Sequence, residues 1–255
     1  TIFLKSDGSI LTCGRNDYGQ LGTGNLNSIS SPVSIIGNHS FTNISGGNLA
    51  SYALKSDGSM WAWGYNFFGT LGDGTTESRS SPVSVVGNHS FSSIVSSSNN
   101  HLGALENGSA WMWGVNSSGQ LGTGNRSAYR IPTSVIGGHS FIKISVGTAF
   151  SAFLKSDGSV WTCGRNLYGE LGTGNSNSRS SPVSVLGNHS FIDISCGATW
   201  TLALKADGSV WVWGNNNYGQ LGTNNLVSYS SPVSVVGNHS FIAICGCTDW
   251  SLALK

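Results

Sequence analysis

Charged residues are scarce in this sequence. Lys, Arg, Asp and Glu make up only 9% of the 255 residues, and the formal net charge is +1. Such a balance offers no electrostatic attraction to nucleic acid or to an anionic membrane surface. We therefore expect neither nucleic acid nor a membrane as a partner.

Long apolar runs are also missing. No stretch approaches the roughly 20 residues that a helix needs to cross a bilayer, and the first residues lack the pattern of a signal peptide. This predicts a soluble chain. Because the sequence begins at Thr1 within a strand-like stretch, we expect a processed or excised product.

Motifs of catalysis and metal binding are absent as well. The five cysteines form neither a C-x-x-C pair nor a zinc-type spacing, so we expect them to be small core residues. The chain has no G-x-S-x-G or H-E-x-x-H motif, and its aspartates fall mostly in Asp-Gly turns. These absences predict a protein that is not an enzyme and holds no cofactor or metal.

What the sequence does have is a period of fifty residues. A D/N-G-S tripeptide recurs with its glycine at 8, 58, 108, 158 and 208, and the five prolines at 32, 82, 132, 182 and 232 keep the same step. The third unit is one residue longer near 96–101 and one shorter near 105–109, so its period survives. We expect a single domain over 1–255 with repeats at 1–41, 42–91, 92–141, 142–191 and 192–241, while 242–255 begins a further unit.

Each unit predicts four short strands. Residues 51–64 alternate apolar and polar side chains around an Asp-Gly turn, which is typical of a β-hairpin. Residues 81–87 form a short strand entered through Pro82, and residues 191–195 alternate again. Because no helical periodicity is present, we expect an all-β chain with almost no helix.

Such a unit suits one blade of a β-propeller. A four-stranded antiparallel sheet cannot cover both of its apolar faces alone, but several sheets packed face to face around an axis can. The Trp, Leu or Cys residues at 11, 13, 61, 63 and their counterparts are then expected between blades.

The stretch GRNDYGQLGTGN at 14–25 contains several glycines but does not predict a phosphate-binding loop. Such a loop precedes a helix and usually carries a Lys, and both are missing here. We expect Gly14, Gly19 and Gly22 to supply positive φ angles or close backbone approach, with Leu21 entering the core.

At this point the repeat resembles a known family. Residues 202–225, LALKADGSVWVWGNNNYGQLGTNN, followed by a strand proline and accompanied by GATWT at 197–201, are similar to the repeat of the regulator of chromosome condensation family, especially its bacterial-style members. The resemblance covers essentially the whole chain and recurs five times. It implies a propeller, usually seven-bladed, that acts through its loops.

The functions that the resemblance implies are diverse. Family members act as an exchange factor for the small GTPase Ran, as chromatin binders, as a plant ultraviolet photoreceptor or as secreted inhibitors of β-lactamase. This chain lacks the basic surfaces of chromatin binders, the Gly-Trp-Arg-His-Thr motif of the photoreceptor and any insertion like the wedge of the exchange factor. Binding of a partner by loops on a rigid scaffold remains as the expectation.

The number of blades stays open between two interpretations. The chain begins with one second-strand segment, TIFLK, and ends with another, SLALK, so a closed ring of five would leave one of them over. Either the five units belong to a longer, perhaps seven-bladed array, or the spare strand pairs with another copy of the chain.

Positions that vary between units are free to carry specificity, and several of them are aromatic. The candidate partner-binding residues are Phe150, Trp200, Trp250, His101, Asn100 and Asp249 before the second strand, and Tyr65, Phe67, Tyr168 and Tyr218 after the third. The alternative for the first group is that these side chains pack and fill the central channel.

Two invariant side chains are expected to be structural. His39 and its counterparts stand in the same Gly-x-His-Ser-Phe context, which favours a turn-stabilising hydrogen bond over a metal or pH-sensing role. Asn16 and its counterparts are expected to bond the backbone of their own turn.

The leading hypothesis is a non-enzymatic scaffold that binds a protein, or copies of itself, through variable aromatic loops. The alternatives are a carbohydrate-binding lectin, suggested by Trp with Asn and Asp, and a self-assembling structural component, suggested by the surplus strand. Low charge and abundant Ser, Asn and Gly favour an extracellular or cell-surface location, although unpaired cysteines weakly oppose it.

Overall fold

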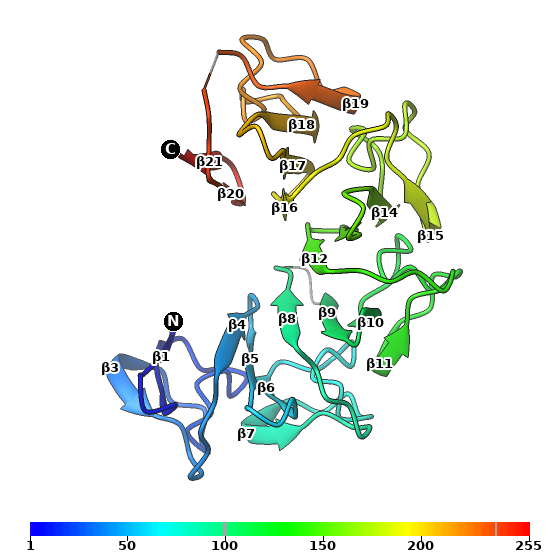
Figure 1. Ribbon diagram of the computed structural model, residues 1–255. Coiled ribbons are helices and arrows are strands. Elements are labelled where there is room, and N and C mark those ends of the chain that lie inside the picture. Colours follow the sequence, from blue (N-terminus) through cyan, green and yellow to red (C-terminus); the bar gives the residue numbers. More distant parts are fainter. Residues whose placement is uncertain (99–100, 238) are drawn as a thin grey trace. The chain divides into compact units, whose positions relative to one another are not determined.

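All regular structure in the described residues is β-strand. The computed structural model describes residues 1–98, 101–237 and 239–255, and within these ranges it contains twenty-one strands and no helix (Figure 1). None of the described residues therefore forms a helix that could cross a membrane. The expectation of an all-β chain is confirmed.

The chain forms two compact units. The first comprises Thr1–Asn107, Trp111–Val115 and Ala128–Thr133, and the second comprises Gly108–Ala110, Asn116–Ser127 and Ser134–Lys255. The expectation of a single domain stays a prediction.

The first strands along the chain build three sheets, in each of which consecutive strands are neighbours. They are β1 (Ile2–Leu4), β2 (Ile10–Gly14) and β3 (Ile29–Ser34); β4 (Asn43–Gly46), β5 (Ala50–Leu54), β6 (Met60–Gly64) and β7 (Arg79–Ser84); β8 (Ser93–Ser96), β9 (His101–Glu106), β10 (Ser109–Gly114) and β11 (Tyr129–Ser134).

The remaining strands lie in the second unit and repeat the same order. They are β12 (Lys143–Val146), β13 (Phe150–Leu154), β14 (Val160–Gly164) and β15 (Arg179–Ser184); β16 (Asp193–Cys196), β17 (Trp200–Leu204), β18 (Val210–Gly214) and β19 (Tyr229–Ser234); and the pair β20 (Ala243–Gly246) and β21 (Ser251–Leu254).

The strand pairs of the sheets β1–β3, β4–β7, β12–β15 and β16–β19 are antiparallel, and their registers repeat every fifty residues. In the sheet of β16–β19, Ala203 lies opposite Trp211, and Trp211 lies opposite Ser234. A bulge between Val212 and Gly214 lets the ladder resume at Tyr229. The same bulge occurs at Thr12, Ala62 and Thr162.

The hairpin between the second and third strands turns in one of two ways. In most repeats Lys, Ser, Asp and Gly form a loop in which the Asp carboxylate accepts the backbone N–H two residues on, as Asp57 does from Ser59 at 2.8 Å. The third repeat replaces this loop by Asn107 and Gly108, with φ angles of 51° and 80°, the pair that a two-residue hairpin turn requires. This shorter turn offsets the extra residue before β9.

The prolines were expected at the start of their strands, but they lie within them. Pro82 is the fourth residue of β7 and does not open the strand. It is tolerated there because β7 is the last strand of its sheet, where a missing N–H breaks no ladder. The strand begins earlier because Arg79 pairs with Gly64 beyond the bulge.

The second strands of three sheets are buried on both faces. All five residues of β5, β13 and β17 are buried, so these strands form the centre of the core. The third-strand Trp at 63, 113 and 213 is fully buried. Of the five unpaired cysteines, Cys163 and Cys196 are buried as expected, but Cys245 is exposed.

The Gly-rich stretch after each third strand is organised by one buried Asn. The Asn166 Oδ1 atom accepts the Leu171 N–H at 2.9 Å, and its Nδ2 group donates to the carbonyl oxygens of Asn175 at 2.9 Å and Asn177 at 3.1 Å. The side chain is fully buried, and the equivalent Asn16, Asn66, Asn116 and Asn216 bind Leu21, Leu71, Leu121 and Leu221 in the same way. The structural role expected for this Asn is confirmed.

Replacing Asn166 by Ala should lower the free energy of unfolding by about 2–4 kcal/mol, because it leaves the buried Leu171 N–H and the part-buried carbonyl groups of Asn175 and Asn177 without this partner. Urea denaturation monitored by Trp fluorescence measures the change. The matched control is Asn177→Ala, since Asn177 is exposed in the same loop and only its backbone takes part in these hydrogen bonds. Equal losses in both variants would contradict the role assigned to the Asn166 side chain.

Candidate partner-binding surface

Four aromatic side chains in the first unit contact one another at the surface. The ring centroids of Tyr18 and Tyr65 are 4.9 Å apart and nearly perpendicular, and those of Phe67 and Phe68 are 5.1 Å apart. Tyr65 also lies 6.4 Å from each Phe ring. We call Tyr18, Tyr65, Phe67 and Phe68 the aromatic cluster.

The cluster forms because the loop after β2 packs on the next sheet. The Ser51 hydroxyl donates to the Gln20 carbonyl oxygen at 2.9 Å. Gly19 lies so close to Ser80 that a Cβ atom there would stand 2.4 Å from the Ser80 Cα. Two loops that are fifty residues apart in the sequence are thereby held side by side.

The aromatic cluster is accessible. Phe67 is 65% exposed and Phe68 is 38% exposed, while Tyr18 and Tyr65 are half-buried. An exposed ion pair between Arg15 and Asp17, at 2.5 Å, lies in the same loop as Tyr18. Aromatic side chains are enriched at the centres of protein interfaces, while charged pairs belong mostly to the polar rim around them.

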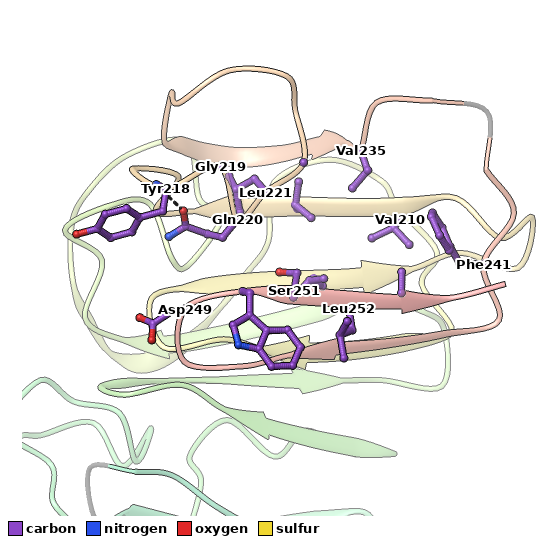
Figure 2. A pocket seen from close by; sticks show the side chains of 15 residues that line it. Val210, Tyr218, Gly219, Gln220, Leu221, Val235, Phe241, Asp249, Ser251 and Leu252 are labelled. Atoms are coloured by element: carbon purple, nitrogen blue, oxygen red, sulfur yellow. Dashed lines mark hydrogen bonds between the residues drawn. The ribbon is translucent and has the colours of Figure 1, made fainter.

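Two of the predicted aromatic residues lie in the corresponding loops of the second unit. Tyr168 is 40% exposed, and the Arg165 guanidinium lies 5.9 Å from the centre of its ring. Tyr218 is 82% exposed, and its ring points away from the turn (Figure 2). Both are accessible, as are Tyr65 and Phe67 of the prediction.

The residues predicted before the second strands are placed differently. Phe150 and Trp200 begin β13 and β17 and are 0% and 1% exposed, so their expected exposure in loops is wrong. Their rings fold back over Gly147 and Gly197, where a Cβ atom would collide with them. The Trp200 indole N–H also donates to the Ser251 hydroxyl at 2.9 Å. The packing alternative describes these two side chains.

His101 begins β9 at the same position of its repeat and is also fully buried. Its Nδ1 atom is 2.8 Å from the Ser97 hydroxyl oxygen, so the expectation of an accessible side chain is again wrong. Trp250 is 53% exposed and Asp249 is exposed. The predicted Asn100 lies outside the described residues.

The sequence alone did not select Tyr18 and Phe68. Both belong to the variable positions after a third-strand glycine. The feature of the sequence that could have selected them as binding residues was their aromatic residue type. Their contacts depend on the packing of the 15–20 loop against the next sheet, which no local pattern encodes.

A buried carboxyl group lies beside Tyr168. Glu170 is fully buried where the other repeats have Gln20, Thr70, Gln120 and Gln220. Its Oε1 atom accepts the Arg165 Nε–H at 3.1 Å, and its Oε2 atom accepts the Tyr168 N–H at 2.8 Å. Burial nevertheless raises the pKa of Glu170 above its usual value.

The repeated His packs on an indole. The ring centroids of His139 and Trp161 are 4.1 Å apart, and the Lys155 Nζ atom lies 4.5 Å from the centroid of the Trp161 ring. Burial, and then the nearby Lys, lower the pKa of His39, His139 and His189. His89 instead meets Glu106, at 2.9 Å, because the third repeat carries Glu where the others have Lys. At His39, His139 and His189, a tilted contact with the indole therefore takes the place of the expected turn-stabilising hydrogen bond.

With the repeated sheets and their loops described, comparison with known proteins identifies the family. The sequence profile of the RCC1-like domain matches residues 1–255. The chain belongs to the RCC1-like domain family. Its four-stranded sheets are therefore propeller blades, and the expected resemblance is confirmed. A comparison with curated proteins gave no match.

Solved structures agree with the RCC1-like assignment. Human WBSCR16 matches with a TM-score of 0.86 and 20% identity over 99% of this chain and 68% of its own. Yeast RCC1 (Prp20) bound to Kap60 matches with a TM-score of 0.84 and 18% identity over 98% and 63%. A second structure of Prp20p, from Saccharomyces cerevisiae, matches with a TM-score of 0.83 and 19% identity over 99% of this chain and 65% of its own.

The likeness establishes the fold of the RCC1-like chain. The chain spans about two-thirds of the length of these neighbours, which is compatible with a segment of a larger propeller. A parent with seven blades stays a prediction.

Replacing Glu170 by Gln should raise the free energy of unfolding at pH 7 by about 1 kcal/mol, because Gln fills the same space without burying a charge. A raised pKa means that the folded state binds the proton more tightly than the unfolded state. The free energy of unfolding of the wild type therefore falls as pH rises above 4.5, the ordinary pKa of Glu, because the buried Glu170 must then carry a charge. The Gln variant has no such group, so its stability does not fall for this reason. Urea denaturation at pH 4 and pH 7 tests this, and an advantage that is equal at both values would contradict it.

The partly buried His39, His139 and His189 predict a loss of stability in mild acid. The pKa values of His39, His139 and His189 are lowered in the folded chain, so the unfolded chain takes up protons first as pH falls below about 6.5. This proton uptake favours the unfolded state. A triple variant with Gln at His39, His139 and His189 should lose less stability between pH 7 and pH 5.5 than wild type. Thermal denaturation at both values measures the difference, and an unchanged pH dependence would contradict it.

Proposed function

We propose that this RCC1-like chain is a non-enzymatic scaffold that binds a protein partner through the aromatic cluster. The observation that carries the proposal is the contact of four aromatic side chains at an exposed site, two of them Phe. Apolar aromatic surface of this kind gains free energy when a partner removes it from water.

The fold supports binding of proteins in general. One neighbour, yeast RCC1 (Prp20), is seen bound to Kap60, and Prp20p has binding properties to Gsp1p and histones. This chain differs from a binder of strongly charged partners, since its net charge is +1 and its cluster is apolar. We therefore propose a partner with an apolar, weakly charged contact surface, encountered outside the cell or at its surface.

The carbohydrate-binding alternative has lost one of its supports. It depended on Trp beside Asn and Asp at loop tips, and Trp200 is buried. Self-association through a surplus strand is the other alternative, and mass photometry at micromolar concentration distinguishes it from binding of a different protein.

A photo-reactive phenylalanine analogue at position 67 should crosslink to a discrete protein in the source cells. The double variant Phe67→Ser and Phe68→Ser should lower recovery of that protein about tenfold or more, because loss of central aromatic residues weakens an interface strongly. Quantitative mass spectrometry of the captured material gives the measurement.

The matched control is Ile192, which is 55% exposed in the second unit. The analogue at position 192 should not crosslink to the same protein, and Ile192→Ser should leave its recovery unchanged. Thermal denaturation of every variant checks that the fold is kept. Equal capture from positions 67 and 192, or full recovery with the double variant, would refute the proposal.

A further inference from the structure

The Gly-rich stretch after each third strand is a socket for the sheet that follows it. Position 22 of the repeat lies against a third-strand side chain of the next sheet, in the pairs Gly22 with Trp63, Gly72 with Trp113, Gly122 with Cys163 and Gly172 with Trp213. In three of these pairs the indole or thiol donates to a carbonyl oxygen of the socket, from Trp113 to Thr70 at 3.0 Å, from Cys163 to Gln120 at 3.4 Å and from Trp213 to Glu170 at 2.9 Å. Within the ranges that the structure describes, the Trp63 indole N–H is buried without a partner.

Each of these sockets also binds the fourth strand of the following sheet. The N–H of Gly174 donates to the Ser230 carbonyl oxygen at 2.7 Å, and Gly169 lies directly against the Ser230 backbone. The same hydrogen bond joins Gly24 to Ser80, Gly74 to Arg130 and Gly124 to Ser180. One socket therefore recognises a two-stranded hairpin, with an indole or thiol on one strand and a carbonyl on the other.

The fifth socket, residues 214–225, has the same backbone as the other four. Gly219 and Gly222 have φ angles of 78° and 65°, and Asn224 takes the place of the last Gly at 58°. The Leu221 N–H donates to Asn216 Oδ1 at 2.9 Å, as in the other repeats. Among the described residues, a Cβ atom at Gly222 would meet only Val235, and one at Gly219 only Leu226.

A groove of about 310 Å³ lies beside this socket (Figure 2). Gln220, Leu221 and Gly222 line one side, and residues around β21 line the other. Its volume falls within the range of about 300–1,000 Å³ typical of ligand pockets. The groove is lined mainly by apolar side chains, and its polar lining residues include Gln220, Asp249 and Ser251.

The opposite wall of the groove is a strand whose counterparts are covered. Ala253 of β21 is exposed, whereas the equivalent Ala53 and Ala203 are 0% exposed. Trp250 is 53% exposed, whereas the equivalent Trp200 is 1% exposed. In the described part of the chain, β21 pairs with β20 alone, so its second edge carries unpaired backbone groups.

We infer that the fifth socket and the free edge of β21 bind a β-hairpin of the RCC1-like repeat type. Its first strand pairs with β21 and places an indole against Gly222, with the indole N–H donating to the Gln220 carbonyl oxygen. Its second strand offers a carbonyl oxygen to the Asn224 N–H. The four occupied sockets show what this surface recognises, and the surface shares no residue with the aromatic cluster.

The probe is a synthetic peptide of residues 205–235, which contains β18, its socket loop and β19. Fluorescence anisotropy should show binding of the labelled peptide to the intact chain with a Kd below about 100 μM. Peptide with Trp213→Ala should bind at least about tenfold more weakly, because it lacks the indole that fills the groove.

The blocking variant of the protein is Ala253→Arg, which places a long charged side chain in the groove at an exposed position. It should weaken binding of the peptide at least about tenfold, while Ile192→Arg, the matched exposed control, should leave binding unchanged. Binding that Ala253→Arg does not weaken would overturn the inference.

A fusion provides a second measurement, because an isolated hairpin peptide is itself only marginally folded. Residues 206–241 are joined directly after Lys255, in phase with the repeat. The fusion should melt at a higher temperature than the parent chain, and Ala253→Arg should abolish the gain. Absence of both peptide binding and a gain in the fusion would overturn the inference. A homodimer that Ala253→Arg dissociates, without peptide binding, would overturn it in favour of a second copy as the occupant.

Discussion

The structure depends on covering sheets that are apolar on both faces. The second strands, such as β13 and β17, are buried along their whole length, so each four-stranded sheet needs neighbours on both sides. The Gly-rich stretch meets this requirement, since its glycines let the backbone of one sheet approach the indole of the next. The buried Asn holds this stretch in one conformation, and the exposed loop residues beside it are then free to vary.

The period and composition of the sequence predicted most of this architecture. The fifty-residue step, the Asp-Gly turns and the alternating segments identify the strands because turn chemistry and strand periodicity are local properties. The same is true of the positive φ angles at Gly14, Gly19 and Gly22, which the structure shows at 117°, 81° and 69°. Where Pro82 falls within its strand depends on a bulge and on the edge position of β7, which are properties of the whole sheet.

The candidate site was harder to predict, because exposure is a tertiary property. Phe150 and Trp200 follow loop-like residues, and variation between repeats favoured them as binding residues. Both rings instead lie over a Gly that has no side chain to exclude them. Phe67 and Tyr218 vary in the same way but follow a glycine at the end of the third strand, and there the side chain turns to solvent. Variation alone could not separate these two cases.

The two-residue turn at Asn107 and Gly108 has a consequence for how such a chain can change. A residue inserted within a strand reverses the facing of every later side chain, but the extra residue of the third repeat precedes β9 and leaves its pairing unchanged, since Leu105 lies opposite Ser93 as Leu54 lies opposite Asn43. The shorter turn then restores the fifty-residue period, so Trp113 has the same place near the end of its strand as Trp63 and Trp213. Repeats of this kind can accumulate small insertions and deletions as long as each is balanced within its own hairpin, so that units from different chains remain interchangeable at the junctions between them.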